Sequence, residues 1–478
     1  MHTLDILVPA PQRCCKSSGK FALSALKKFW VDPAWNDDAF AGKIRALFSF
    51  FGLTAEPVSD PAEAQFCLFE SKAVGRAGAF TLEITPEGFQ LSAGERSGAD
   101  YALAACRQIF FGALRCGTFN AAFDCGRVED QPRFEFRSLH LDSARQFQSV
   151  SVICQVLKLM AELRLNVFHW HLVDNEGWRL KLESAPGLEN HFLKTPGYYT
   201  AGDIAEIRAL AQSLNIEIIP EIDIPGHSIG TLEYFPQYAC ENADGVVGEF
   251  CLGNEEGKTF IKSVLDEVME LFPDSRYIHI GGDEAETRSW DKCPRCRRAM
   301  QEANCSTMRQ LENKFMIEMS RHVVAAGRIP VQWGTCSDQR YPVDTVIQTW
   351  LDIREPLRVA ANGNKVIYSV HTSLYFDYPA NLSEPFETWM FELSERGVYM
   401  TDPYIIWPDA VKDAILGTEA CLWTEQVPQW RVIRKILPRL AAYSECAWSL
   451  PENKDYHNFA QRREYLESAG WVDYLYRS

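Results

Sequence analysis

Residues 277–284 read YIHIGGDE, in which an apolar stretch runs into two glycines and then into two adjacent carboxylates. An apolar run bounded by glycine is typical of a buried strand, and the glycines allow the backbone to turn and to approach a ligand closely. Two neighbouring carboxylates cannot both ionise freely, so the pKa of one of them rises. The stretch therefore predicts a strand that ends in a pair for acid–base chemistry, although an isolated Asp-Glu pair is more often a solvated turn.

Other stretches of the chain have the same apolar character and the length of buried strands. They cover residues 137–142, 166–174, 216–223, 329–334, 345–351, 365–370 and 415–423. Amphipathic stretches typical of helices lie between several of them, at residues 150–163, 203–214, 257–272 and 311–327. Strands that alternate with helices in this way predict a closed (β/α)₈ TIM barrel, in which the short link between the fifth and sixth strands is a degenerate repeat.

The carboxyl ends of these predicted strands carry polar, charged or tryptophan side chains. They are Asp142 and Arg145, His171 and Asp174, Asp223 and His227, Asp283 and Glu284, Trp333, Trp350, Tyr375 and Asp377, and Trp423 and Glu425. Enzymes with this barrel build their active sites at these ends, so the position favours a functional Asp283-Glu284 pair over a solvated turn. Cleavage of a glycosidic bond needs one protonated acid for the leaving oxygen and one anion that faces the developing positive charge.

Residues 1–131 have a different pattern, which predicts a small α+β domain before the barrel; we assign the barrel to residues 132–478. The expected boundary is the sequence Asp-Gln-Pro-Arg at 130–133. Ser97 or Asp100 would cap the last helix of the domain. The expected elements are a strand at 3–8, helices at 21–30, 40–52 and 97–114, and a hairpin at 79–93 that turns at Pro86-Glu87-Gly88.

The chain of 478 residues carries a net charge of -16 and has a pI of about 5.2. Nucleic acid and anionic membranes are therefore not expected as partners, because both bind basic patches. The sequence has no apolar run that approaches the roughly 18 residues of a membrane span, and its first residues lack the basic and apolar regions of a secretory signal. We therefore expect a cytoplasmic protein unless a signal has been trimmed, and the oligomeric state stays open.

His169 and His171 lie on the same face of the second predicted barrel strand, which raises the alternative of a metallohydrolase. That class needs further ligands at later strand ends, but the fifth, sixth and eighth strands end in tryptophan and the chain has only ten histidines. Packing or supporting histidines are the better interpretation. We therefore predict no catalytic metal ion and no cofactor.

A separate metal question concerns the Cys-x-x-Cys sequence at 293–296. Together with Cys305, or with Cys240 and Cys251, these thiols would suit a structural zinc ion. A four-ligand set is not evident from the sequence, so free thiols and a disulfide remain as alternatives.

Several motifs together carry a resemblance to a known family. They are FRSLHLDSARQF at 136–147, NVFHWHLVDNEGWR at 166–179, PEIDIPGH at 220–227, YIHIGGDEA at 277–285, Tyr-Phe-Asp at 375–377 and LGTEACLWTE at 416–425. The chain resembles glycoside hydrolase family 20, the β-N-acetylhexosaminidases, from about residue 134 to the closing stretches ECAWS and REYLESAGW. Its N-terminal region resembles the α+β domain that precedes the barrel in that family.

The resemblance implies an exo-acting, retaining β-N-acetylhexosaminidase that removes terminal non-reducing GlcNAc or GalNAc from glycans. In this family the acetamide of the substrate attacks the anomeric carbon and forms an oxazolinium intermediate. By motif, Glu284 would be the general acid and base, and Asp283 would align the acetamide. The other implied roles are Tyr375 on the acetamide oxygen, Trp333, Trp350 and Trp423 as the acetamide pocket, Arg137, Asp377 and Glu425 on sugar hydroxyls, and Asp174 and His227 as support for Glu284.

Two alternatives remain at this point. A relative with a longer pocket would release a disaccharide such as lacto-N-biose from the same fold, and a catalytically silent barrel would bind carbohydrate without cleaving it. The presence of both Asp283 and Glu284 argues against the silent barrel. The sequence does not separate GlcNAc from GalNAc or identify the glycosidic linkage.

Overall fold

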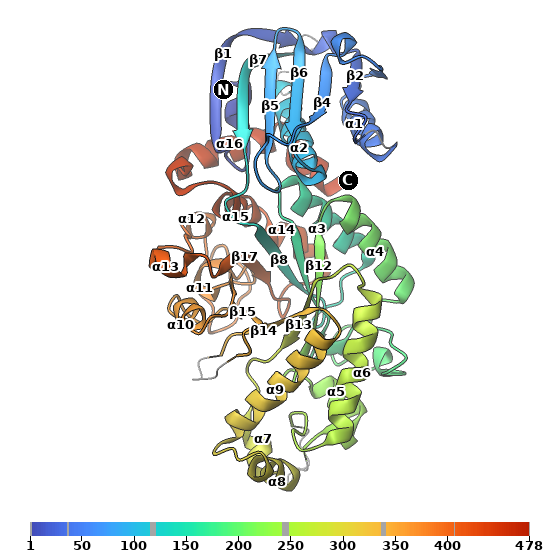
Figure 1. Cartoon of the computed structure of the whole chain (residues 1–478), viewed down its shortest axis with the longest axis vertical. Coiled ribbons are helices and arrows are strands. Elements are labelled where there is room, and N and C mark those ends of the chain that lie inside the picture. The colour runs from blue at the N-terminus through green and yellow to red at the C-terminus, as the bar shows by residue number, and fades with distance from the viewer. Residues whose placement is uncertain are drawn as a thin grey trace.

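The structure is a computed structural model that describes residues 2–35, 38–114, 121–240, 248–335, 341–405 and 407–477. Figure 1 shows an N-terminal sheet with its helices above a barrel of strands, which is surrounded by further helices. No helix in the described ranges is long and apolar enough to cross a membrane.

The N-terminal unit is a seven-stranded sheet with the order β1-β7-β5-β6-β4-β2-β3. Its strands are β1 (Arg13–Ala22), β2 (Lys28–Val31), β3 (Glu56–Pro57), β4 (Phe66–Glu70), β5 (Phe80–Thr85), β6 (Gly88–Ala93) and β7 (Ala122–Asp130). Helices α1 (Asp38–Phe50) and α2 (Arg96–Leu114) pack on the sheet through aromatic contacts among Phe48, Phe89 and Phe110. Burial of these rings supplies the unit with a core of its own.

The second unit is a closed barrel of parallel strands in the order β12-β13-β14-β15-β16-β17-β8-β9. The strands are β8 (Phe136–Asp142), β9 (Val167–His171), β12 (Glu217–Ile224), β13 (Tyr277–Gly281), β14 (Ile329–Trp333), β15 (Val346–Thr349), β16 (Val366–Tyr368) and β17 (Ile415–Leu422). A short ribbon of β10 (Val173–Asp174) and β11 (Gly177–Trp178) follows β9. Each predicted barrel strand corresponds to one strand of the barrel, so the predicted (β/α)₈ fold is confirmed.

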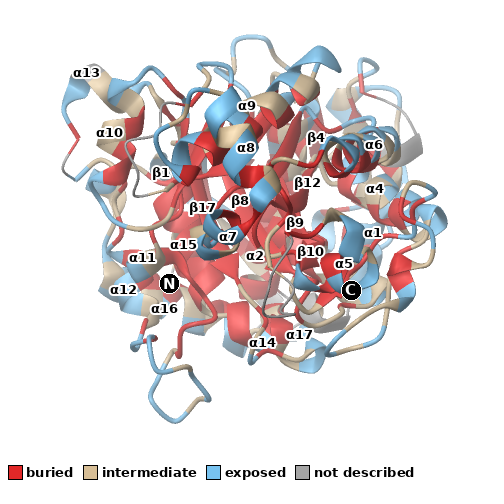
Figure 2. Ribbon diagram, turned by 90° about the horizontal axis from the view of Figure 1, so that it is seen from below, coloured by how far each residue is buried: buried red, intermediate tan, exposed pale blue. Residues whose placement is uncertain are grey.

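Helices surround the barrel and bury one side against it, as Figure 2 shows by the ring of helices around the buried strands. On α6, Ile261, Val264, Leu265 and Val268 are buried at the spacing of an amphipathic helix. The described residues between β14 and β15 contain no helix, as the degenerate repeat predicts. The helices are α3 (Val150–Glu162), α4 (Ala201–Ser213), α5 (Ile229–Tyr234), α6 (Glu255–Leu271), α7 (Thr287–Lys292), α8 (Pro294–Glu302), α9 (Met308–Ala325), α10 (Glu355–Ala361), α11 (His371–Leu374), α12 (Glu395–Tyr399), α13 (Asp409–Lys412), α14 (Val432–Ile436), α15 (Arg439–Trp448), α16 (Tyr456–Ser468) and α17 (Trp471–Arg477).

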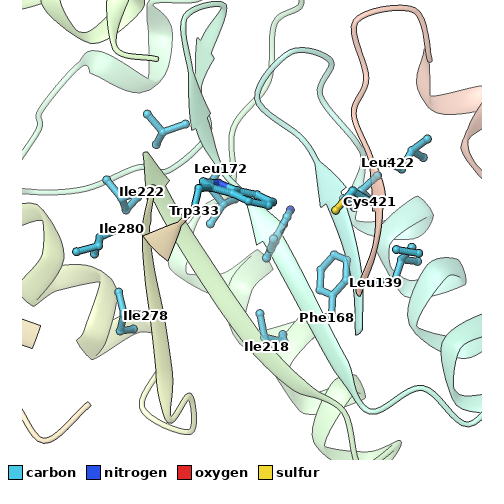
Figure 3. Close-up of a cluster of buried hydrophobic side chains, with 14 of the residues drawn as sticks. Leu139, Phe168, Leu172, Ile218, Ile222, Ile278, Ile280, Trp333, Cys421 and Leu422 are labelled. Atoms are coloured by element: carbon cyan, nitrogen blue, oxygen red, sulfur yellow. The ribbon is translucent and has the colours of Figure 1, made fainter. Parts of the chain in front are cut away.

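The alternation of side chains along each strand separates the outside of the barrel from its inside. Ile218, Ile222, Ile278 and Ile280 of β12 and β13 belong to the core between the barrel and its helices (Figure 3). Nearer the carboxyl ends, the interior is polar and surrounds the fully buried Glu221. At the amino ends the interior is an apolar plug with residues from seven strands: Phe136, Val167, Ile219, Tyr277, Val331, Val346 and Ile367.

The first residues of the chain do not form the strand that the apolar pattern at 3–8 predicts. Thr3–Ile6 is a 3-10 helix. Leu4 and Leu7 lie in the core of the N-terminal sheet, while Ile6 and Val8 lie in the core of the barrel. The predicted strand at 3–8 is therefore wrong. The run is apolar because it is buried between two cores.

Two further predictions in this unit also differ from the structure. The predicted helix at 21–30 is wrong, because Phe21 pairs with β7 and Phe29 pairs with β4, which draws both into the sheet. Helix α2 begins at Arg96, so Ser97 and Asp100 lie inside it and neither is its cap. The predicted helix at 40–52 and the predicted hairpin at 79–93 are present as α1 and as the antiparallel pair β5 and β6.

A buried ion pair holds the junction between the sheet and the barrel. Asp130, the last residue of β7, accepts from Nη1 of Arg164 at 2.5 Å, and neither side chain is exposed. Trp448 of α15 donates its Nε1–H to the other oxygen of Asp130 at 2.9 Å. A charge in this setting is stable only while its partner is present.

We expect Asp130→Ala to lower the free energy of unfolding by about 3–5 kcal/mol, because Arg164 then keeps a buried charge without its partner. Urea denaturation of the purified protein, followed by tryptophan fluorescence, measures the change. The control Glu63→Ala removes the partner of Lys28 from an exposed pair and should cost about 0–1 kcal/mol. Equal and small effects of the two variants would contradict the role assigned to Asp130.

Candidate active site

A cleft of about 450 Å³ lies at the carboxyl ends of the barrel strands. It brings together most of the side chains predicted for the site, while Arg137, Asp174 and Trp333 do not line it. The lining residues are Arg145, His227, Asp283, Glu284, Trp350, His371, Tyr375, Asp377, Tyr378, Trp389, Met390, Trp423 and Glu425.

The turn after β13 gives the two carboxylates opposite environments. Gly281 and Gly282 adopt φ values of +62° and +103°, and a Cβ atom at Gly281 would lie 1.7 Å from Oδ1 of Asp223. Glycine is therefore required at this position. Glu284 is also left-handed, with φ of +49°, and its side chain is 58% exposed. Asp283 is buried, with 8% of the residue exposed.

These environments set the protonation of the pair. Burial and the neighbouring Glu284 raise the pKa of Asp283 to about 6, against the opposing effect of His227. The hydrogen bond from His227 holds the pKa of Glu284 below its ordinary value. In the open cleft Asp283 is therefore the weaker acid of the two.

A chain of hydrogen bonds, which we call the relay, runs through Glu221, His171, Asp174, His227 and Glu284. His171 contacts Glu221 through Nδ1 at 2.6 Å and Asp174 through Nε2 at 2.9 Å. Asp174 accepts from Nδ1 of His227 at 3.2 Å, and Nε2 of His227 lies 3.5 Å from Glu284. Burial by itself would lower the pKa of both imidazoles, but their carboxylate partners raise it well above the ordinary value. Negative and positive charges therefore alternate along the relay.

The histidines of β9 serve as partners of buried carboxylates. Both ring nitrogens of His171 contact carboxylates of the relay. His169 contacts Glu419 through Nδ1 at 2.9 Å and lies 3.1 Å from Glu221 through Nε2. The His-x-His pattern therefore places two imidazoles among buried carboxylates, which is the supporting role predicted for them.

Aromatic side chains form part of the cleft wall. The rings of Tyr375 and Trp423 have centroids 6.2 Å apart, and Trp350 donates its Nε1–H to the carbonyl of Gly334 at 2.9 Å. Trp333 lies behind Trp423, with ring centroids 5.7 Å apart, and only 1% of it is exposed. Its indole donates to Glu221 at 2.6 Å, which draws the ring into the barrel. Trp333 therefore supports the predicted wall from behind and does not form it.

The cleft is also lined by two further carboxylates, Asp377 and Glu425. Burial and the charge of Glu425 raise the pKa of Asp377 to about 8. Arg145 lies 3.2 Å from Glu425 and 2.9 Å from Asp174. One oxygen each of Asp283, Asp377 and Glu425 is buried and accepts no hydrogen bond within the described part of the chain. Since buried polar groups are normally paired, these oxygens suit a ligand that is rich in O–H and N–H donors.

The sugar-binding role predicted for Arg137 is wrong, because this side chain lies at the opposite end of the barrel. Its guanidinium donates to the carbonyls of Arg164 and Phe134 at 2.8 and 2.7 Å and to the hydroxyl of Tyr101 at 2.9 Å. Arg145 is the arginine that lines the cleft. Arg137 is the second residue of β8, at its amino end, while Arg145 follows the carboxyl end of that strand.

Other lining residues were not predicted: His371, Tyr378, Trp389 and Met390. Nδ1 of His371 lies 2.7 Å from the hydroxyl of Tyr378, and Trp389 is 62% exposed. All four follow β16 in a segment without a regular apolar period, so no local pattern predicts their position. An exposed tryptophan beside a polar cleft adds an aromatic surface on which a sugar can pack.

Comparison with known proteins identifies the family that carries this site. Residues 134–451 match the family described as "Glycosyl hydrolase family 20, catalytic domain". Residues 5–131 match "Glycosyl hydrolase family 20, domain 2". The two matches together span both the sheet and the barrel.

Individual relatives agree with these matches. A β-hexosaminidase of Akkermansia muciniphila is 28% identical over 407 residues, which are 80% of this chain and 82% of that protein. A β-N-acetylhexosaminidase of Cellulomonas fimi is 30% identical over 360 residues, which are 70% of this chain and 68% of that protein. The solved structure of an exo-β-N-acetylglucosaminidase of Vibrio harveyi in complex with N-acetylglucosamine is 26% identical, with a TM-score of 0.88 over 98% of this chain and 78% of that one. The predicted family and the predicted class of glycoside hydrolase are confirmed, and the chain belongs to glycosyl hydrolase family 20.

Proposed function

We propose that the chain is an exo-acting, retaining β-N-acetylhexosaminidase that hydrolyses terminal non-reducing GlcNAc or GalNAc from glycans. The observation that carries the proposal is the division between Asp283 and Glu284 in one cleft. A buried carboxylate suits alignment of an amide, and an exposed carboxylate suits proton exchange with a leaving group and with water. The names of the relatives from Akkermansia muciniphila and Cellulomonas fimi support the same substrate class.

The sugar ring would bind through the charged groups at the polar part of the cleft. Arg145 offers N–H donors, and Asp377 and Glu425 offer carboxylate oxygens, so hydroxyl groups have charged partners of both kinds. Hydrogen bonds to charged groups are stronger than those between neutral groups. They would fix the ring and leave its acetamide facing Asp283.

The acetamide would be the nucleophile. Asp283 accepts its N–H, Tyr375 donates to its oxygen, and Trp350 and Trp423 exclude water from it. A neutral amide is a weak nucleophile, but one held in place has a high effective molarity. A dry aromatic wall also strengthens the interaction between the carboxylate and the positive charge that develops on the amide.

The reaction would proceed in two steps. In the first, the acetamide oxygen forms a bond to the anomeric carbon, the bond to the leaving oxygen breaks, and Glu284 gives its proton to that oxygen. The product is an oxazolinium ion whose N–H is paired with Asp283. In the second, Glu284 takes a proton from water, the water oxygen bonds to the anomeric carbon, and the bond from that carbon to the acetamide oxygen breaks, which restores the acetamide. Two inversions leave the β configuration unchanged.

These roles need Glu284 protonated and Asp283 ionised, which is the reverse of their order in the open cleft. A substrate that covers Glu284 removes water from an exposed carboxylate, and this raises its pKa. The amide N–H gives Asp283 a hydrogen-bond donor, which lowers the pKa of that carboxyl. Substrate binding would therefore favour transfer of the proton from Asp283 to Glu284.

A single sugar is a better fit than a disaccharide as the released unit. The relatives reported above are named for hexosamine release, and the Vibrio harveyi structure contains N-acetylglucosamine. A panel of aryl glycosides of GlcNAc, GalNAc, lacto-N-biose and glucose separates these substrates. The largest kcat/KM on lacto-N-biose would return the function to the disaccharide alternative.

We expect Glu284→Gln to reduce turnover by about a hundredfold to ten-thousandfold on substrates with poor leaving groups, because general acid help is lost. The loss should be smaller on a nitrophenyl glycoside, since nitrophenolate leaves without a proton. Steady-state kinetics on both substrates measure the difference. The control is Glu286→Gln, an exposed carboxylate two residues away that does not line the cleft. Equal losses on the two substrates would exclude the acid role.

The pH dependence of kcat/KM should report Asp283 in the open cleft. The reaction needs one proton on the pair, and the open cleft holds that proton on Asp283, so kcat/KM should fall as the pH rises through about 6, the pKa of Asp283. The remaining activity of Asp283→Asn should lack this limb near 6, because the variant has no carboxyl at that position to carry the proton. A wild-type kcat/KM that stays constant as the pH rises through 6 would show that Asp283 does not supply the proton that Glu284 uses.

Substrate assistance predicts three linked results. The plain β-glucoside should be essentially inert, because it has no acetamide. A thiazoline analogue of the cyclic intermediate should inhibit far more strongly than GlcNAc does, since the site is shaped for that species. The first product seen by NMR should be the β anomer. A covalent glycosyl ester trapped on Asp283, or an α product, would indicate a different mechanism.

A further inference from the structure

Four cysteines gather outside the cleft, on the loops that follow β12 and β13. Cys240, Cys251, Cys293 and Cys296 are all buried, and their sulfur atoms all lie within 4.8 Å of one another. The Sγ atoms of Cys240 and Cys296 are 3.7 Å apart, those of Cys251 and Cys293 are 3.7 Å apart, and those of Cys251 and Cys296 are 3.6 Å apart.

These distances match the edges of a metal-centred tetrahedron. A zinc–sulfur bond of about 2.3 Å places two ligand sulfurs of a tetrahedral site about 3.8 Å apart. A disulfide would bring two sulfurs to about 2.05 Å, and none of the three measured pairs, at 3.6–3.7 Å, is that close.

We propose that Cys240, Cys251, Cys293 and Cys296 bind one structural Zn²⁺ ion through four thiolates. Four protein ligands complete a tetrahedron and leave no open position for water or substrate, which is the pattern of structural and not of catalytic zinc. Thiolate ligands also select soft metal ions over Mg²⁺ or Ca²⁺.

The local backbone brings the ligands together in two pairs. Cys293 is the N-cap of α8 and Cys296 lies in its first turn, with Pro294 at the first helical position. Cys251 follows the bridge between Ala239 and Phe250, and Cys240 follows it on the other side. This arrangement turns two short segments toward a common centre.

A glycine permits the close approach of the two pairs. A Cβ atom at Gly253 would lie 2.4 Å from the carbonyl oxygen of Arg295. No other residue fits that space without moving the α8 segment away from the loop after β12. The side chain of Arg295 adds a contact across the same junction, because it donates to the carbonyl of Ala239 at 3.1 Å.

The cluster joins the two loops that carry the last two members of the relay. The loop after β12 contains His227, and Glu284 precedes α7 and α8, which lie at the end of the molecule remote from the N-terminal sheet (Figure 1). Trp290 of α7 donates to the carbonyl of Phe250 at 2.9 Å, and the N–H of Phe250 donates to Pro225 at 3.4 Å. A zinc ion would therefore hold the contact between His227 and Glu284 in place; this consequence rests on the proposed function, whereas the metal site does not.

Metal analysis of the full chain tests the site without any substrate. Protein expressed with added zinc and purified without chelator should contain about one zinc ion per chain. A mercurial reagent that caps thiols should release that zinc, seen with a colorimetric zinc indicator, as the four thiols react. Protein that binds no zinc and holds these four cysteines as free thiols would overturn the proposal. Two disulfides among these cysteines, or stoichiometric iron in place of zinc, would also overturn it.

A double variant and a matched control locate the ion. Cys293→Ser/Cys296→Ser should lose the zinc and unfold at a lower temperature, because binding of a structural metal contributes to folding. Cys305→Ser should keep the zinc, since Cys305 lies outside the cluster. If the double variant does not fold, the release of zinc from the wild type by the mercurial still tests whether thiolates hold the ion. Zinc retained in a folded double variant would overturn the proposal.

Activity measures separately whether the zinc ion holds His227 against Glu284. Loss of zinc should lower kcat for the GlcNAc glycoside more than it raises KM, because the contact between His227 and Glu284 loosens while the sugar contacts remain. Full activity after loss of zinc would remove the positioning effect and leave the metal site intact. Inactive wild-type protein with one bound zinc would count against the proposed function alone.

Discussion

The site depends on one buried negative charge in the middle of the barrel. Glu221 is fully buried, and its oxygens lie 2.6 Å from His171, 3.0 Å from His279 and 2.6 Å from the indole nitrogen of Trp333. Burial raises the pKa of Glu221, but the surrounding imidazoles outweigh it and hold that pKa well below its ordinary value. A buried charge of this kind adds little stability by itself. Its effect is to fix which neighbours are cations and how their rings are oriented.

The relay extends the effect of the Glu221 charge to the cleft. Burial raises the pKa of Asp174, but Arg145, His227 and the hydrogen bond from His171 outweigh it, so Asp174 stays ionised and keeps His227 protonated. An imidazolium then faces Glu284 and keeps it ionised while water has access to it. In the proposed mechanism Glu284 becomes protonated only when a substrate displaces that water. The protonation of Glu284 and the occupancy of the cleft are therefore linked. The charge that organises the barrel interior thereby makes the acid depend on substrate binding.

The parts of this arrangement that could be predicted from the sequence are those with a local pattern. Apolar runs that end in polar residues located the barrel strands and the Asp283-Glu284 pair, because parallel strands in a barrel present their carboxyl ends together. Arg137 was misplaced because a shift of a few residues decides which end of a strand a side chain occupies. The stretch at 3–8 misled because its apolar residues face two different cores. The cysteine cluster joins residues 42 positions apart or more across the two loops, a distance over which no spacing rule operates.

The geometry of the acid is strained as well as charged. His227 and Glu284 both adopt left-handed backbone conformations, with φ of +48° and +49°, and each such residue costs about 1–3 kcal/mol. A Cβ atom at Gly226 would lie 2.9 Å from the carbonyl of Asp283, so the two turns are packed directly on each other. Neither turn would hold this conformation alone, because a free loop would relax toward ordinary φ values. Contacts behind the loops must therefore oppose the strain, and the buried cysteine cluster lies where the same two loops meet again.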